Sequence, residues 1–86
     1  MEEIDKITKK FDGFKKIDYD DNYAYLRDKE VGKSNVIEVR ILRGSLGSYS
    51  TKFVVEKKGC RNKLFSGADE DKTINRIKSY LKSNKC

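Results

Sequence analysis

The chain of 86 residues contains no histidine and no proline, and only two cysteines. Without histidine, it lacks the side chain that most often serves as a general acid or base near neutral pH. Two cysteines alone, far apart in the sequence, do not form a zinc knuckle. The sequence therefore predicts no catalytic site, no metal site and no cofactor, and we expect the protein not to be an enzyme.

Long apolar segments are also missing. No stretch approaches the roughly 20 apolar residues that a membrane span needs, and the acidic start Met1-Glu2-Glu3 does not resemble a signal peptide. We therefore expect a cytoplasmic protein without a membrane partner. Because the cytoplasm keeps thiols reduced, we favour free thiols at Cys60 and Cys86. A disulfide between them stays an alternative, since the tail could fold back.

The composition limits the size of the core. Apolar residues make up 36% of the chain and charged residues 40%, which is low and high, respectively, for a globular protein. A domain of this length buries only about 60–65% of the surface that its unfolded chain exposes. We predict one domain, over residues 1–86, with a thin core and no room for a deep active site.

Charge is distributed unevenly along the chain. Residues 1–30 hold seven Lys and Arg against nine Asp and Glu, a net charge of −2. Residues 31–86 hold thirteen against five, a net charge of +8. A segment this basic indicates a negatively charged partner, either nucleic acid or an acidic protein surface.

Apolar residues recur at helical spacing near both ends of the chain. The N-terminal set predicts a helix over about residues 2–12, with Gly13 as its end: Ile4, Ile7, Phe11 and Phe14. The C-terminal set, with Tyr80 at its edge, predicts a second helix: Ile74, Ile77 and Leu81. We expect Ser66 as the N-cap of this helix, with Asp69 three residues on.

Between the helices, apolar and polar residues alternate with a period of two, which is typical of strands. Four strands are expected, over residues 23–29, 37–41, 49–56 and 61–65, and the acidic residues 18–22 are expected to form a turn. In the first strand, two sets of residues are equally able to face inward. One set contains Tyr23 and Tyr25, and the other contains Ala24 and Leu26.

The predicted fold class is α+β, in the order α-β-β-β-β-α. An antiparallel meander sheet with both helices packed on one face buries all the apolar stripes at once. This layout resembles that of the double-stranded-RNA-binding domain, α-β-β-β-α. The resemblance implies no functional residues here, because the second helix begins with Asp69-Glu70-Asp71 where that family has a lysine-rich cluster.

Such a fold leaves the second face of the sheet open to solvent. We expect Ile37, Val39, Phe53 and Leu64 to face the helices. If Ala24 and Leu26 also face inward, the opposite face presents these candidate nucleic-acid-binding residues: Arg40, Lys52, Arg61, Lys63, Tyr23, Tyr25 and Phe65. The four cations would neutralise phosphates and the three rings would stack on unpaired bases.

Two short motifs are weaker. The loop Gly44-Ser45-Leu46-Gly47 has the G-x-x-G form of a phosphate-clamping loop, but it joins two strands, and we expect an ordinary hairpin connection. Asp18, Asp20 and Asn22 match the start of a calcium loop, but Tyr23 stands where that loop requires glycine. We expect an acidic turn there.

The function predicted from the sequence is that of a small non-enzymatic binding protein, whose basic sheet face contacts single-stranded nucleic acid or the phosphate backbone. The alternative is a protein-interaction module, or an inhibitor of the kind carried by phages and mobile elements, that blocks a partner enzyme by occupying its surface. The oligomeric state is left open by the sequence.

Overall fold

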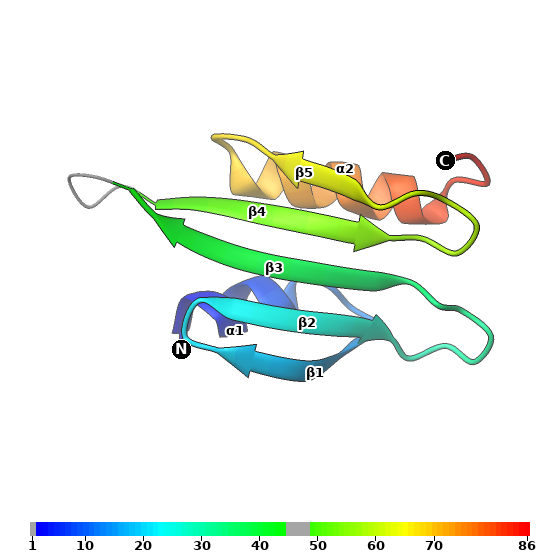
Figure 1. Ribbon diagram of the computed structural model, residues 1–86, viewed down its shortest axis with the longest axis horizontal. Helices are drawn as coiled ribbons and strands as arrows, with labels where there is room; N and C mark the ends of the chain where they lie inside the picture. The colour runs from blue at the N-terminus through cyan, green and yellow to red at the C-terminus, as the bar shows by residue number, and fades with distance from the viewer. Residues whose placement is uncertain (1, 45–48) are drawn as a thin grey trace.

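A computed structural model describes residues 2–44 and 49–86. Its five strands pair antiparallel in the order β1-β2-β3-β4-β5, with one helix before them and one after (Figure 1). The elements are α1 Glu2–Lys9, β1 Phe14–Asp20, β2 Tyr23–Asp28, β3 Val36–Arg43, β4 Tyr49–Glu56, β5 Lys63–Ser66 and α2 Glu70–Lys82. This arrangement confirms the predicted α+β class and the meander sheet.

Both helices lie on the same side of the sheet, behind it in the view of Figure 1. Helix α1 packs against β1 and β2, and α2 packs against β5. None of the helices in the described part of the chain is long and apolar enough to cross a membrane. We call the sheet surface away from the helices the outer face.

The core lies between the sheet and the helices. Alternate residues of the three central strands supply one side of it, because successive side chains of a strand point to opposite faces. The helices supply the other side, and Phe11, just after α1, packs edge-on against Phe53 with ring centres 6.0 Å apart. The core residues are Ile4, Ile7, Phe11, Ala24, Leu26, Ile37, Val39, Ile41, Phe53, Val55, Phe65, Ile74 and Ile77.

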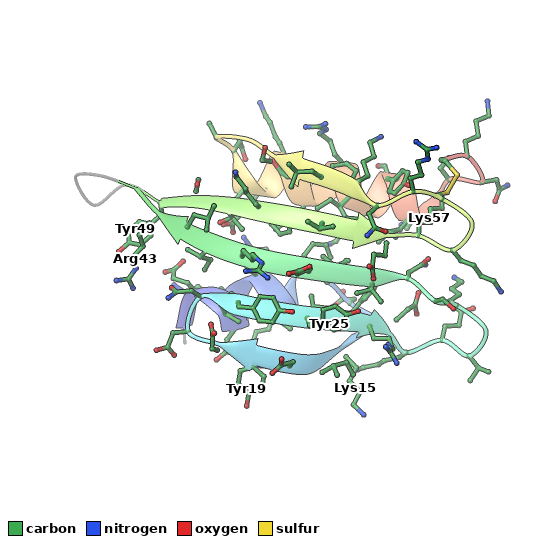
Figure 2. The ribbon with its side chains drawn as sticks, viewed as in Figure 1. Lys15, Tyr19, Tyr25, Arg43, Tyr49 and Lys57 are labelled. Atoms are coloured by element: carbon green, nitrogen blue, oxygen red, sulfur yellow. A yellow bond between two sulfur atoms is a disulfide. The ribbon has the colours of Figure 1, made fainter. Side chains whose placement is uncertain are left out.

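The facing of β2, which the sequence left open, follows from this core. Ala24 and Leu26 are both 0% exposed beneath the helices. Tyr23 and Tyr25 therefore stand on the outer face, and Tyr25 lies in front of the sheet in Figure 2.

The expectations for the segment before β2 were wrong in two respects. Helix α1 ends at Lys9, and the chain then turns through Gly13, whose φ of +85° favours glycine. Residues 18–20, expected in a turn, belong to the edge strand β1. This strand shows no clear alternation, because its register shifts between Lys16 and Asp18 and most of its side chains are exposed.

The start of α2 also differs from the prediction. Its N-cap is Asp69, whose carboxylate accepts a hydrogen bond of 3.1 Å from the Lys72 backbone amide. Ser66, the expected cap, is the last residue of β5. A carboxylate that caps a helix satisfies an amide that has no partner within the helix and also complements the helix dipole.

A disulfide and a lysine hold the C-terminal tail against the sheet. Cys60, in the turn after β4, is bonded to Cys86, so the favoured interpretation of free thiols does not hold in this structure (Figure 2). The amine of Lys57 donates hydrogen bonds to three carbonyls at and beyond the end of α2, those of Tyr80, Ser83 and Lys85. This cation joins the last turn of α2 to the tail beyond it and complements the negative end of the helix dipole.

Replacing both cysteines by serine should lower the free energy of unfolding by about 3 kcal/mol, because the disulfide closes a loop across 26 positions. Urea unfolding, followed by circular dichroism, measures this. The wild-type protein in excess dithiol reductant should match the Cys60→Ser/Cys86→Ser variant. Equal stability of the oxidised and reduced proteins would show that the disulfide does not stabilise the fold.

Helix α1 is attached to β1 by an ion pair. The Lys16 amine donates to the Asp5 carboxylate at 2.8 Å. This hydrogen bond, together with the charge of Lys16, holds the pKa of Asp5 below its usual range. A lowered carboxyl pKa stabilises the fold above the unfolded-state pKa, and that contribution is lost as the pH falls through the lower, folded-state value.

The pKa of Asp5, measured by NMR titration, should therefore lie below the usual aspartate value. In the Lys16→Met variant it should rise back towards that value. The extra stability of the wild type over this variant should begin to fall below about pH 4 and vanish once the pH lies below the lowered pKa of Asp5. An unshifted Asp5 pKa in the wild type would show that the ion pair does not form in solution.

Candidate functional site

The structure divides the seven predicted nucleic-acid-binding residues among three places. Four of them stand on the outer face, where the register places them side by side on β2, β3 and β4: Tyr23, Tyr25, Arg40 and Lys52. Lys63 and Phe65 belong to β5 but face the helices. Arg61 precedes β5, in the turn that contains the disulfide.

The predicted facing of β5 was wrong. Phe65 pairs with Phe53 and is 4% exposed, whereas Leu64, expected in the core, is 59% exposed on the outer face. In a strand of four residues, one apolar residue lies on each face, so alternation alone does not choose between them. The larger ring fills the space beside Tyr80 of α2, with ring centres 5.6 Å apart.

The outer face is not basic. Three rows of cross-strand neighbours on this face contain four cations, Lys15, Arg27, Arg40 and Lys52, and four carboxylates, Asp18, Asp20, Glu38 and Glu56. The guanidinium of Arg40 is paired with Glu38 at 2.8 Å. A surface with equal numbers of positive and negative charges does not attract a polyanion. The expectation that this face binds nucleic acid therefore has no electrostatic support.

The tyrosines of the outer face are partly engaged as well. Tyr23 lies beneath the guanidinium of Arg40, with 5.0 Å between the guanidinium carbon and the ring centre. Burial, and then the negative charges of Glu38 and Asp18, raise the pKa of Tyr23. One side of this ring is thus already occupied by a cation.

The basic residues gather at the opposite side of the molecule, along β5 and α2. Residues 57–68 and 72–86 contain nine Lys and Arg and no Asp or Glu. Figure 2 shows nitrogen-tipped side chains along this border of the fold. We call the cations on the β5 side of this border the basic edge: Lys58, Arg61, Lys63, Lys72 and Arg76.

Two aromatic rings position the basic edge. The Lys63 amine lies 5.4 Å from the centre of the Phe65 ring and 4.9 Å from that of Tyr80. Arg76 covers the Phe65 ring at 5.6 Å. Lys72 precedes Arg76 by one turn on the same side of α2. Cation–π contacts of this kind bring Lys63 and Arg76 together from two different elements.

None of the five cations forms an ion pair with a carboxylate in the described part of the chain. The acidic residues nearest in sequence are Glu56, which accepts a hydrogen bond from Asn62, and Asp69, Glu70 and Asp71, at the start of α2. Glu70 and Asp71 pair with Lys10, at 3.6 and 2.7 Å, on the side of α2 that faces α1. The charge of the basic edge is therefore not compensated locally.

Such a surface can neutralise phosphates, but it offers no free ring for stacking on bases. Phe65 is buried, and Tyr80 is half-buried beneath the amines of Lys57 and Lys63. Lys72 and Arg76 lie about 6 Å apart along the helix axis, so both can contact the same phosphate backbone. The geometry suits contact with a backbone.

The site residues predicted from the sequence include Arg61 and Lys63 but not Lys58, Lys72 and Arg76. Residues 72–86 contain five cations and no acid, which was a usable signal. The position of β5 beside α2, which brings Arg76 next to Lys63, is not visible in the sequence.

The structure gives no support to a binding role for the G-x-x-G loop or the partial calcium loop. The loop Gly44-Ser45-Leu46-Gly47 lies mostly outside the described residues. Asp18 and Asp20 are part of β1, and Asp20 accepts a hydrogen bond of 2.8 Å from the Asn22 backbone amide in the turn that follows. The described residues contain no group of three acidic, histidine or cysteine side chains that could hold a metal ion.

Compared with family models, with curated proteins and with solved structures, the chain matches none.

The corrected facing of β5 can be tested by stability. Phe65→Ala should lower the free energy of unfolding by about 3–5 kcal/mol, because it opens a cavity beside Phe53 and Tyr80. Leu64→Ala, its neighbour on the outer face, should cost less than about 1 kcal/mol. Chemical denaturation of the two variants measures the difference in free energy of unfolding. If Leu64→Ala costs more than Phe65→Ala, Leu64 faces the helices, as the sequence predicted.

Proposed function

We propose that this chain is a small non-enzymatic protein that binds nucleic acid by contacting the phosphate backbone through the basic edge. The observation that carries the proposal is the cluster of five cations from β5, the preceding turn and α2, none of which is paired with a described carboxylate. Each phosphate contact releases counterions, which drives association of such a surface with a polyanion.

The rings of Phe65 and Tyr80 are covered, and this limits how the basic edge can bind nucleic acid. Since Phe65 and Tyr80 are occupied by the protein's own cations, the basic edge has no exposed ring for base stacking. Binding is therefore independent of base sequence, and duplexes bind as well as single strands do. In this respect the proposal differs from the stacking platform of tyrosines and Phe65 expected from the sequence.

The test is a titration of the protein into labelled duplex DNA, single-stranded DNA and single-stranded RNA at two salt concentrations. The wild type should bind with a steep salt dependence. The Lys63→Ala/Lys72→Ala/Arg76→Ala variant should bind at least tenfold more weakly, and the slope of log K against log salt should fall by about 2–3, since three phosphate contacts are lost.

The matched control removes the same number of charges from the outer face. Arg27→Ala/Arg40→Ala/Lys52→Ala should retain most of the affinity and most of the salt slope of the wild type. If this control loses more affinity for nucleic acid than the basic-edge variant does, the binding site lies on the outer face instead. Absence of binding to all three nucleic acids at low salt would overturn the proposal.

An acidic protein surface is the alternative partner for the same cations, as in an inhibitor that occupies an enzyme's surface. Capture of such a protein from a nuclease-treated lysate by the wild type, and not by the basic-edge variant, would favour this alternative if nucleic acid does not bind.

Cellular location is part of the proposal as well. A nucleic-acid ligand favours the cytoplasm, whereas a disulfide such as Cys60–Cys86 is more common in oxidising compartments. Alkylation of thiols in intact cells, followed by mass measurement, distinguishes the two. Alkylated cysteines would support the cytoplasm, and protected cysteines would contradict it.

A further inference from the structure

The outer face is uncovered and partly apolar. Leu64 is 59% exposed, and Val54 lies half-buried beside it in the cross-strand register. Exposed apolar residues grouped on one surface indicate a contact site. Because the eight charges of this face cancel, two copies of the chain can approach through it although each carries a net charge of +6.

The register arranges these residues in three rows across the strands. The first row contains Asp20, Tyr23, Arg40, Lys52 and Ser66. The middle row contains Asp18, Tyr25, Glu38, Val54 and Leu64. The third row contains Lys15, Arg27, Val36 and Glu56. Each row runs from β1 towards β5.

The first and third rows have complementary charge patterns. Asp20 and Lys15 occupy equivalent ends of these rows on β1, and Lys52 and Glu56 occupy equivalent places on β4. A two-fold axis that crosses the strands along the middle row would exchange the two rows. It would place Asp20 against Lys15 and Lys52 against Glu56, and each pairing would occur twice in the dimer.

The middle row would then meet its own copy. Val54 and Leu64 would pack against the same residues of the second chain. Glu38 would approach its counterpart, but its charge is paired with Arg40 at 2.8 Å. Asp18, at the β1 end of the same row, would also approach its counterpart, at the margin of the interface.

We propose that the outer face binds a second copy of this chain in a two-fold dimer with this axis. Five strands about 4.8 Å apart and three rows about 7 Å apart span about 500 Å² per copy. The dimer would bury about 1,000 Å² in total, the lower limit of a specific interface, so a weak association is expected, with a dissociation constant on the order of 100 µM. The proposal does not depend on nucleic-acid binding.

The test is sedimentation equilibrium of the full chain from about 1 µM to about 1 mM, a range that brackets the expected constant. Lys52→Glu and Glu56→Lys should each weaken the dimer about fivefold to tenfold, because each variant places like charges opposite one another at two points. The double variant Lys52→Glu/Glu56→Lys should restore the affinity to within about twofold of the wild type.

Rescue by the double variant identifies contact between chains. Within one chain, Lys52 and Glu56 are four residues apart on β4, about 13 Å, which is beyond the screening length of about 8 Å at physiological salt. Lys82→Glu, on α2, changes the charge equally and should leave the dimer unaffected. Circular dichroism confirms that each variant is folded.

Two results would overturn the proposal. A protein that stays monomeric to 1 mM does not use this face for self-association, and a dimer in which the double variant is no stronger than the single variants is built on another surface.

Discussion

Burial of one face of the sheet, and only one, is the constraint on which the rest of this structure depends. Ile37 and Val39 of the central strand are fully buried and require cover on one side. A chain of 86 residues has two helices to supply it, one at each end. Both pack on the same face because the alternation in β2, β3 and β4 places the apolar residues there. The outer face is left to solvent as a consequence.

The meander has a second consequence, for charge. When each strand pairs with the next one in sequence, the order of residues along the chain becomes their order across the sheet. The acidic N-terminal third therefore lies on the side of β1 and β2, and the basic C-terminal half lies around β4, β5 and α2. The aromatic pair Phe65 and Tyr80 then fixes Lys63 and Arg76 at this border. Charge separation follows from topology, without long-range pairing of the two halves.

Much of the fold was accessible from the sequence because its strongest patterns coincide with burial. The helical stripe of Ile74 and Ile77, and the alternation from Tyr49 to Glu56, were identified correctly. Strand β1 was not, because an exposed edge strand with a shifted register carries no apolar alternation. The pairing of Cys60 with Cys86 depends on where the tail folds, which local patterns do not encode.

The site was less predictable than the fold. Its location depended on the facing of β5, where Leu64 and Phe65 compete for a single inward position. Choosing Leu64 moved Lys63 and Phe65 to the wrong face and made the sheet surface seem basic. The opposing carboxylates Asp18 and Asp20 were not placed on this face because they were assigned to a turn. Two local errors therefore produced one wrong surface.

The most direct test of the central claim is to map the contact surface by ¹H–¹⁵N NMR, adding a short DNA duplex at low salt. The account predicts amide shift changes concentrated in residues 58–66 and in α2, with little change at Tyr23, Arg40 and Lys52. Shift changes concentrated on the outer face would contradict it.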